Sequence, residues 1–254
     1  MQIVRIFSFV FLLGSFGGSQ LLGQQDQAST MKLVNQLVTT HLAWTSSANS
    51  PGTTLMLDVT PAEKGNFDVQ LRTSGMPANG RYEVISWPLN RTSPSTVLKE
   101  IQLDNNGLAI CGGSASDCGG AASKAPIVIH IQPSPGEPIR LGIWSENHLI
   151  KALAKVVILP LRGMDKGCEV SATLIMPGAA AVLFEASGFE QNERLEIHSS
   201  SGTEAKNNQN QADGTGRFQD VVLPYASGSS HGEITLTISS HHCSPSVTVP
   251  WGTR

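Results

Sequence analysis

Two features that mark common classes of protein are missing from this 254-residue sequence: a strong net charge and long apolar segments. The 17 Lys and Arg residues against 20 Asp and Glu residues give a net charge of -3, so there is no positive excess to bind a nucleic-acid backbone or an anionic lipid surface. No apolar stretch reaches the roughly 20 residues that a transmembrane helix needs. We therefore expect no nucleic-acid partner and no transmembrane segment in the mature chain.

Charged and aromatic residues are also scarce, at 15% and 6% of the sequence. Long tracts of strong helix formers are absent, whereas Gly (25 residues) and Pro (14 residues) recur between short apolar stretches. This composition is typical of an all-β secreted protein, in which turns separate many short strands.

The amino-terminal stretch, MQIVRIFSFVFLLGSFGGSQLLGQQ, has the three-part pattern of a secretory signal peptide. Arg5 supplies the positive charge, residues 6–13 form a short apolar run, and small residues are frequent from 14 to 19. Cleavage after Ser19 or after Gly23 fits the pattern, and we take residues 1–23 as the signal peptide. The mature protein is then expected to be secreted or periplasmic.

Cysteine occurs only four times, at Cys111, Cys118, Cys168 and Cys243. An even number in an exported chain predicts two disulfides, and three pairings are possible. We favour Cys111–Cys118, which would close a Gly- and Ser-rich loop, and Cys168–Cys243, which would join the two ends of one domain.

One phrase of the sequence occurs twice, as TSGMPANGRYEV (Thr73–Val84) and as ASGFEQNERLEI (Ala186–Ile197). Further landmarks follow each copy in the same order: an Asp/Gly turn, an alternating strand that begins with Gly-Glu, and an apolar strand that ends in Pro. Ordered self-similarity of this kind predicts an internal duplication. We therefore expect two similar domains, residues 50–161 and residues 162–254.

The segments around these phrases alternate between apolar and polar residues, which predicts half-buried strands. In NFDVQLR, Val69 and Leu71 would face a core, and in RLEIHS, Leu195 and Ile197 would do so. Such strands, separated by Gly, Pro, Asn and Asp turns, favour antiparallel sandwiches. About seven strands in roughly 100 residues is the size of an immunoglobulin-like unit.

The second copy of the phrase, followed by DGTGRF, resembles bacterial immunoglobulin-like modules of exported and cell-surface proteins. The first copy departs from that pattern, with Met76 where the phrase prefers Phe. The resemblance implies two tandem immunoglobulin-like antiparallel β-sandwich domains and an exported setting. It implies no catalytic residues, because a fold alone does not carry a function.

Residues 24–49, between the predicted signal peptide and the first domain, have polar, linker-like ends. Their middle carries apolar residues near helical spacing, from Met31 to Leu42. We expect a linker with a short helix that covers a domain end, or an extra edge strand through LVTTHLAW. A partner-binding helix is the less favoured alternative, because isolated helices of this length are marginal.

Two motifs suggest chemistry, and we expect neither to supply it. HHC at His241–Cys243 has the residue types of a zinc site, but consecutive residues of a strand point to opposite faces. We therefore predict a disulfide beside two exposed histidines, and no metal site. GSSHG at Gly228–Gly232 matches the nucleophile motif of α/β-hydrolases, but an alternating strand follows it instead of a helix. We predict no catalytic residues and no cofactor.

Trp87 and Trp144 are the strongest candidates for a binding surface. Side-chain alternation in RYEVISWP and IRLGIWSENH places both rings opposite the core-facing residues, where they would stack on a sugar or contact a protein. Trp is usually well buried, however, and we expect at least one of the two to pack beneath other parts of the chain.

These features predict a secreted, non-enzymatic β-sandwich protein that acts as a binding or structural module at the cell envelope or outside the cell. Its partner would be an extracellular or envelope protein or a polysaccharide. The alternative is a carbohydrate-binding protein that uses exposed Trp side chains, and an exported hydrolase comes third.

Overall fold

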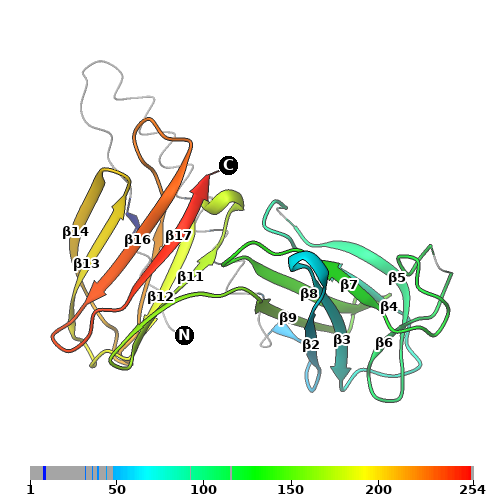
Figure 1. Ribbon diagram of the computed structural model, residues 1–254. Helices are drawn as coiled ribbons and strands as arrows, with labels where there is room; N and C mark the ends of the chain where they lie inside the picture. Colours follow the sequence, from blue (N-terminus) through cyan, green and yellow to red (C-terminus); the bar gives the residue numbers. More distant parts are fainter. Residues whose placement is uncertain are drawn as a thin grey trace. The chain divides into compact units, whose positions relative to one another are not determined.

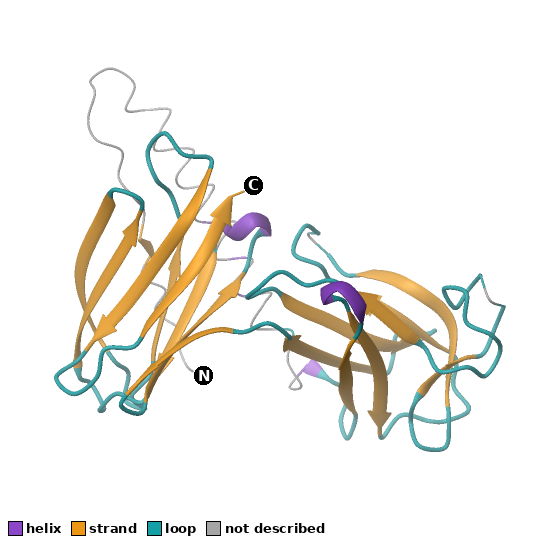
Figure 2. Ribbon diagram, viewed as in Figure 1, coloured by secondary structure: helices purple, strands orange, loops and turns teal. Residues whose placement is uncertain are grey.

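The protein is built almost entirely from β-strands (Figures 1 and 2). The computed structural model describes residues 48–252 apart from Thr92 and Ala115, together with Ser8, Phe9, Lys32, Gln36, Thr39 and Trp44. Two short 3-10 helices, η2 (Glu63–Gly65) and η3 (Pro177–Ala179), interrupt the strands. No helix among the described residues is long and apolar enough to cross a membrane. The predicted all-β class is confirmed.

The chain divides into two compact units. The first unit is Thr40–Ile158, and the second is Leu159–Arg254 together with the described residues before Thr40. Each unit contains two sheets. Among the described residues the strands pair antiparallel, except that the two-residue strand β1 (Ser8–Phe9) lies parallel to β15.

The first unit has a three-stranded and a five-stranded sheet (Figure 1). The three-stranded sheet has the order β2-β3-β7, with β2 at Thr54–Pro61, β3 at Phe67–Ser74 and β7 at Val128–Ile131. The five-stranded sheet has the order β6-β5-β4-β8-β9, with β6 at Ala109–Cys111, β5 at Ser95–Leu103, β4 at Tyr82–Ser86, β8 at Pro138–Ser145 and β9 at Lys151–Val157.

Side chains from both of these sheets meet in one apolar core, so the first unit has two layers. Val69 and Leu71 of β3 are fully buried there, as the alternation of NFDVQLR predicts, and Ile143 of β8 meets them from the facing sheet. Tyr82 of β4 lies in the same core. Its hydroxyl donates a 2.5 Å hydrogen bond to the carbonyl of Pro77, so this buried polar atom has a partner.

The second unit has a five-stranded and a four-stranded sheet. The five-stranded sheet has the order β1-β15-β12-β11-β10, with β15 at Phe218–Val222, β12 at Val182–Ser187, β11 at Cys168–Leu174 and β10 at Leu161–Asp165. The four-stranded sheet has the order β14-β13-β16-β17, with β14 at Glu204–Gln211, β13 at Arg194–Ser201, β16 at His231–Ser239 and β17 at Ser246–Gly252.

Both sheets of the second unit also carry buried apolar side chains. Leu195 and Ile197 of β13 are buried while their neighbours Glu196 and His198 are exposed, as the alternation predicts. Phe184 of β12 is fully buried in the other sheet. Strand β17 contacts β10 and β11 across the two sheets, so this unit is two-layered as well.

Both units use the same order of strands. The set β2-β3-β7 of the first unit corresponds to β11-β12-β15 of the second, and β5-β4-β8-β9 corresponds to β14-β13-β16-β17. The repeated phrase falls at the same place in each unit: it runs from the end of β3 into β4, and from the end of β12 into β13. The similarity in sequence is thus matched by a similarity in topology.

The Asp/Gly turn has the same structure in both units. Oδ1 of Asp104 and Oδ1 of Asp213 each accept hydrogen bonds from the N–H groups two and four residues further on, at 2.8 to 3.0 Å. The glycines three residues after these aspartates, Gly107 and Gly216, have φ angles of +75° and +71°. Gly is required there because a left-handed backbone is strained for other residues.

Gly216→Ala is expected to destabilise the second unit, because this turn leaves no room for a Cβ atom. The added atom would lie 2.1 Å from the carbonyl oxygen of Phe189, and the positive φ adds strain. We expect the free energy of unfolding, measured in urea, to fall by at least about 2 kcal/mol. Gly214→Ala in the same turn is the control, since its Cβ would meet nothing within 4 Å. Equal losses in the two variants would contradict the argument.

Most of the amino-terminal predictions fall outside the described residues. This applies to the signal peptide apart from β1, to both cleavage positions, and to most of the linker at residues 24–49. Within that linker Lys32, Gln36 and Thr39 are helical, and Trp44 is buried.

Candidate functional site

Trp87 and Trp144 lie on the outer face of the five-stranded sheet of the first unit, and that face is covered. A second apolar cluster lies there, formed by the buried side chains of Trp44, Ile85 and Leu153, with the two half-buried Trp rings packed against them. The strand alternation predicts the correct face of the sheet for both residues. Their rings are nevertheless only partly exposed to solvent, because other side chains pack against them.

Trp44 is the residue that sequence reasoning missed in this cluster. It comes from the predicted linker and is only 3% exposed. Its ring meets that of Trp87 edge to face, with 5.6 Å between the centroids, and its Nε1 donates a 3.0 Å hydrogen bond to the carbonyl of Ala154 on β9. A Trp in a polar linker beside a domain is the signal that could have indicated such a contact, because a large apolar ring is rarely left exposed.

Arg140 completes this cluster on β8. Its guanidinium lies 5.4 Å from the centroid of the Trp87 ring, and the residue is 6% exposed. Burial lowers the pKa of Arg140, and the nearby charge of Glu137 opposes that shift. Among the described residues, neither Nε of Arg140 nor Nε1 of Trp144 has a hydrogen-bond partner. Half-buried rings and two buried donors without partners therefore lie close together.

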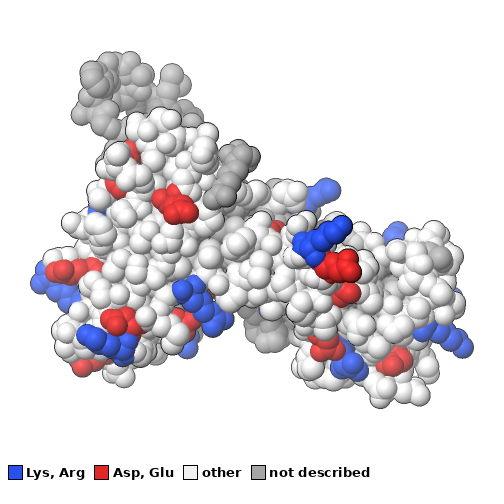
Figure 3. All heavy atoms as spheres, in the orientation of Figure 1, with Lys and Arg blue, Asp and Glu red and all other residues white. Residues whose placement is uncertain are grey.

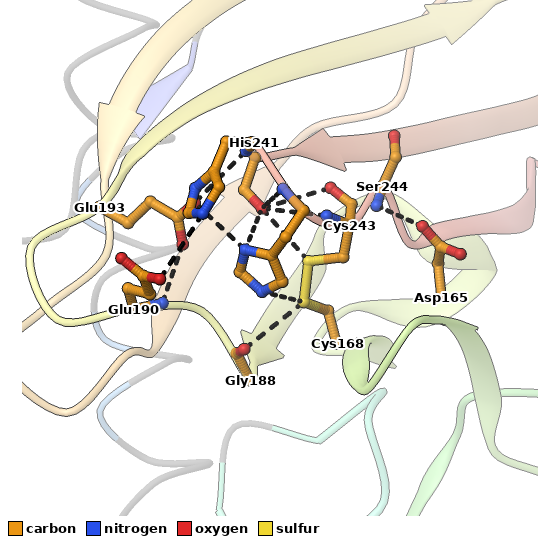
Figure 4. Close-up of polar contacts among 10 residues, drawn as sticks. Asp165, Cys168, Gly188, Glu190, Glu193, His241, Cys243 and Ser244 are labelled. Carbon is orange, nitrogen blue, oxygen red and sulfur yellow. Dashed lines mark hydrogen bonds and ion pairs between the residues drawn. A yellow bond between two sulfur atoms is a disulfide. The ribbon is translucent and has the colours of Figure 1, made fainter.

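A second candidate site, made of polar side chains, lies where two turns of the second unit meet (Figure 4). His241 and His242 lie in the turn between β16 and β17, and Glu190 and Glu193 lie in the turn between β12 and β13. Nδ1 of His241 is 2.5 Å from Oε1 of Glu193, and Nδ1 of His242 is 3.5 Å from the same oxygen. The two imidazole rings are 4.7 Å apart.

The strand argument used against a metal site at HHC is wrong in its premise. His241, His242 and Cys243 are not in a strand, because β16 ends at Ser239 and β17 begins at Ser246. Consecutive residues of a turn are free to point the same way, and here both imidazoles approach one carboxylate. Pro245, two residues after Cys243, is the sequence signal that could have indicated a turn.

The carboxyl of Glu193 is the least exposed part of this site, since its side chain is 7% exposed. Burial acts to raise its pKa, but hydrogen bonds outweigh this effect and hold the pKa below its ordinary value. These bonds come from the N–H of Glu190, from the ring and N–H of His241, and from the hydroxyl of Ser240. Glu193 is therefore held as a carboxylate directed at the histidines.

Both favoured disulfide pairings are present. Cys111–Cys118 has a Cα–Cα distance of 5.6 Å and closes a loop between β6 and β7. Cys168–Cys243 has a Cα–Cα distance of 6.2 Å and joins β11 of one sheet to the turn before β17 of the other. The second bond lies beside the histidine turn, with Nε2 of His242 3.4 Å from Sγ of Cys168.

The hydrolase-like segment GSSHG leads directly into a strand. Ser230 is the residue at the nucleophile position, and β16 begins with His231. Oγ of Ser230 lies 3.4 Å from Nδ1 of His231, its own neighbour in sequence. This is not the strand–turn–helix arrangement that the motif needs.

Asp213 and Asp220 have opposite surroundings. Asp213 accepts hydrogen bonds from the hydroxyl and N–H of Thr215 and from the N–H of Arg217, which lower its pKa. Asp220 is 3% exposed, and burial raises the pKa of its carboxyl to about 7, although the N–H of Val221 and the charge of Lys206 act in the other direction. The pKa values of the two carboxyls are therefore shifted in opposite directions.

Surface charge gives no further site on the face shown in Figure 3. Acidic and basic side chains occur there in small mixed groups separated by uncharged surface. A surface of this kind does not attract one type of charged partner over a long range.

These features define an all-β protein of paired sheets with two disulfides. No protein-family model matches the chain, and no curated protein matches it by sequence. A crystal structure of red sea bream transglutaminase is similar to it, with a TM-score of 0.24 and 11% sequence identity over 79% of this chain and 31% of that chain. The chain spans about a third of that protein, and a similarity at this level carries no argument about function.

Proposed function

We propose that this protein is an exported, non-enzymatic module made of two immunoglobulin-like β-sandwiches, which binds another molecule or forms a structural link at the cell envelope or outside the cell. The observation that supports this most directly is the repeated strand order, with the same Asp/Gly turn in each unit. A duplicated framework of this kind is used widely for recognition and for spacing. Its partner would be an extracellular or envelope protein or a polysaccharide.

The disulfides support the exported setting, because such bonds persist mainly in oxidising compartments. Cleavage of residues 1–23 and release into the periplasm or the medium are part of the same proposal. Amino-terminal sequencing of the protein recovered from each compartment tests them, and an intact amino terminus in the cytoplasm would contradict them.

The binding role is tested by exposing the exported chain to a glycan array and to envelope protein fractions, with each unit's disulfide intact. Retention of one class of molecule is the expected result. Retention of neither class would contradict a binding role, and turnover in a panel of ester, glycoside and peptide substrates would contradict the non-enzymatic assignment.

The second candidate is a carbohydrate-binding protein that uses Trp87 and Trp144. The half-buried rings of these residues and the unpartnered donors of Arg140 and Trp144 favour it, because sugar sites combine an aromatic face with polar groups. The packing of both rings against the outer cluster, with Trp87 in contact with Trp44, favours the first proposal.

Trp87→Ala and Trp144→Ala distinguish the two candidates. If the rings mainly fill the outer cluster, each change should lower the free energy of unfolding by about 3 kcal/mol, as large-to-small changes in packed regions do. Leu149→Ala is the control, since Leu149 is a large apolar residue in the same unit that is 77% exposed. Polysaccharide binding is measured by the change in tryptophan fluorescence. Variants that keep their stability but lose polysaccharide binding would instead favour the carbohydrate role.

A further inference from the structure

We infer that Nδ1 of His241, Nδ1 of His242 and Oε1 of Glu193 form a binding site for one divalent transition-metal ion, with Zn²⁺ as the ion that fits best. One ligand atom from each of these three residues lies within 4.8 Å of the other two. The site is separate from the Trp cluster of the first unit and from any role of that cluster in binding.

The ligand atoms are held before binding by hydrogen bonds that an ion would replace, Nδ1 of His241 with Oε1 of Glu193 and Nδ1 of His242 with Oγ of Ser240 at 3.2 Å (Figure 4). Oε2 of Glu193 accepts the N–H of Glu190 at 2.8 Å, which leaves Oε1 directed at the histidines. Nε2 of His241 lies 3.5 Å from Oε1 of Glu190, and Nε2 of His242 lies 3.4 Å from Sγ of Cys168. Metal-binding histidines commonly give their second ring N–H to a carboxylate, and the contact of His241 with Glu190 is of this kind.

The distances require one small adjustment. Around a tetrahedral Zn²⁺ with bonds of about 2.1 Å, ligand atoms lie roughly 3.4 Å apart. The 3.5 Å separation between Nδ1 of His242 and Oε1 of Glu193 already meets this requirement. The 2.5 Å hydrogen bond between Nδ1 of His241 and the same oxygen has to open by about 1 Å, which the exposed His241 side chain is free to do.

The donor types select the class of ion. Two imidazole nitrogens and one carboxylate oxygen suit Zn²⁺ and Cu²⁺, whereas Ca²⁺ and Mg²⁺ require shells of oxygen atoms. The Glu193 side chain is 7% exposed and the His241 side chain 63%, so the ion would rest on a buried carboxylate and face solvent on its other side. The fourth position is then open to water or to a side chain of a partner.

The Cys168–Cys243 disulfide positions this site. Cys243 directly follows His242, and its bond to Cys168 fixes the turn against β11. The N–H groups of His242 and Cys243 lie 3.3 Å from Oγ of Ser240, which further fixes the backbone of the turn. The backbone that carries both histidines is therefore held in place before an ion arrives, and only the exposed His241 ring has to adjust.

Calorimetric titration with Zn²⁺, without reductant and on the chain that carries both disulfides, tests the site. We expect one ion per chain, and at least a tenfold loss of affinity in His241→Gln and in His242→Gln, both of which replace solvent-accessible side chains. His130→Gln is the control, because His130 forms a comparable exposed pair with a carboxylate, 2.7 Å from Oδ1 of Asp68 in the first unit, and should bind Zn²⁺ as the wild type does. No uptake by the wild-type chain, or unchanged affinity in both His variants, would overturn the inference.

A second measurement identifies the ligands directly. Co²⁺ in place of Zn²⁺ should give the visible absorption of a nitrogen- and oxygen-bound ion, with no sulfur-to-cobalt charge-transfer band. Uptake that appears only after reduction, together with such a band, would assign the ion to the thiolates of Cys168 and Cys243 and would also overturn the inference.

Discussion

Asp220→Asn is expected to remove most of the pH dependence of the second unit's stability between about pH 4 and pH 7. Asp220 lies on the inward face of β15, opposite Phe184 of β12, and is 3% exposed. Burial raises the pKa of its carboxyl to about 7 in the folded chain, whereas an unfolded Asp titrates near 3.9. Folding therefore takes up a proton between these pH values, and stability falls as the pH rises through this range.

The size of this effect follows from the separation of the two pKa values. A difference of about 3 units corresponds to roughly 4 kcal/mol, fully present below about pH 4 and lost by about pH 8. The Asn side chain keeps an oxygen that accepts the N–H of Val221, at 2.8 Å in the wild type, and carries no charge to desolvate. At pH 8 the variant should then be more stable than the wild type, by up to roughly 4 kcal/mol.

Urea denaturation of both proteins over a series of pH values measures the effect. Glu185→Gln removes an exposed carboxylate from the neighbouring strand β12 and serves as the control. A wild-type protein whose stability did not change between about pH 4 and pH 7, or a variant with the same slope as the wild type, would show that Asp220 is ionised in the folded state.

Loss of the Cys168–Cys243 bond is expected to have an effect of similar size. This bond closes a loop of 75 residues, which corresponds to about 4 kcal/mol in the chain-entropy model. The Cys111–Cys118 bond closes a loop of 7 residues and should contribute only about 2.5 kcal/mol. The second unit should therefore lose more stability than the first when both bonds are reduced.

The double variant Cys168→Ser/Cys243→Ser isolates the longer bond, and Cys111→Ser/Cys118→Ser is its matched control. Thermal unfolding followed separately for the two units, with Trp251 of β17 as a reporter for the second unit, gives the two losses. A larger loss in the control variant would mean that native-state packing, and not loop length, decides what each bond contributes.

Much of the framework could be predicted because it depends on local pattern. Alternation in NFDVQLR and RLEIHS gives the buried faces of β3 and β13 correctly. The preferred pairing of the four cysteines, argued from their positions near domain ends and around a Gly-rich loop, is the pairing that the structure has. The matched Asp/Gly turns have the same hydrogen bonds, because their Asp and Gly spacing dictates them.

The candidate site was harder to predict, because alternation tells which face a side chain takes but not what covers that face. The outer positions of Trp87 and Trp144 follow from pattern, but the covering ring, Trp44, comes from a segment with no strand pattern of its own. The burial of the Asp220 carboxyl could have been predicted, because the alternation in FQDVV places it on the same face as Phe218 and Val222. The histidine turn was missed because strand spacing was applied to residues that lie between strands.

The loop that carries Cys111–Cys118 shows where this architecture tolerates change. In the second unit the chain passes from the Asp/Gly turn directly into β15, whereas in the first unit residues 112–127 intervene between β6 and β7. The N–H of Ile127 donates a hydrogen bond to the carbonyl of Ala109, so the two ends of this segment lie side by side. Because the two ends of the insertion meet, each doubling of its length would cost only about 0.6 kcal/mol in closure entropy. New surface can thus be acquired here by insertion alone, with no change in the register of any strand.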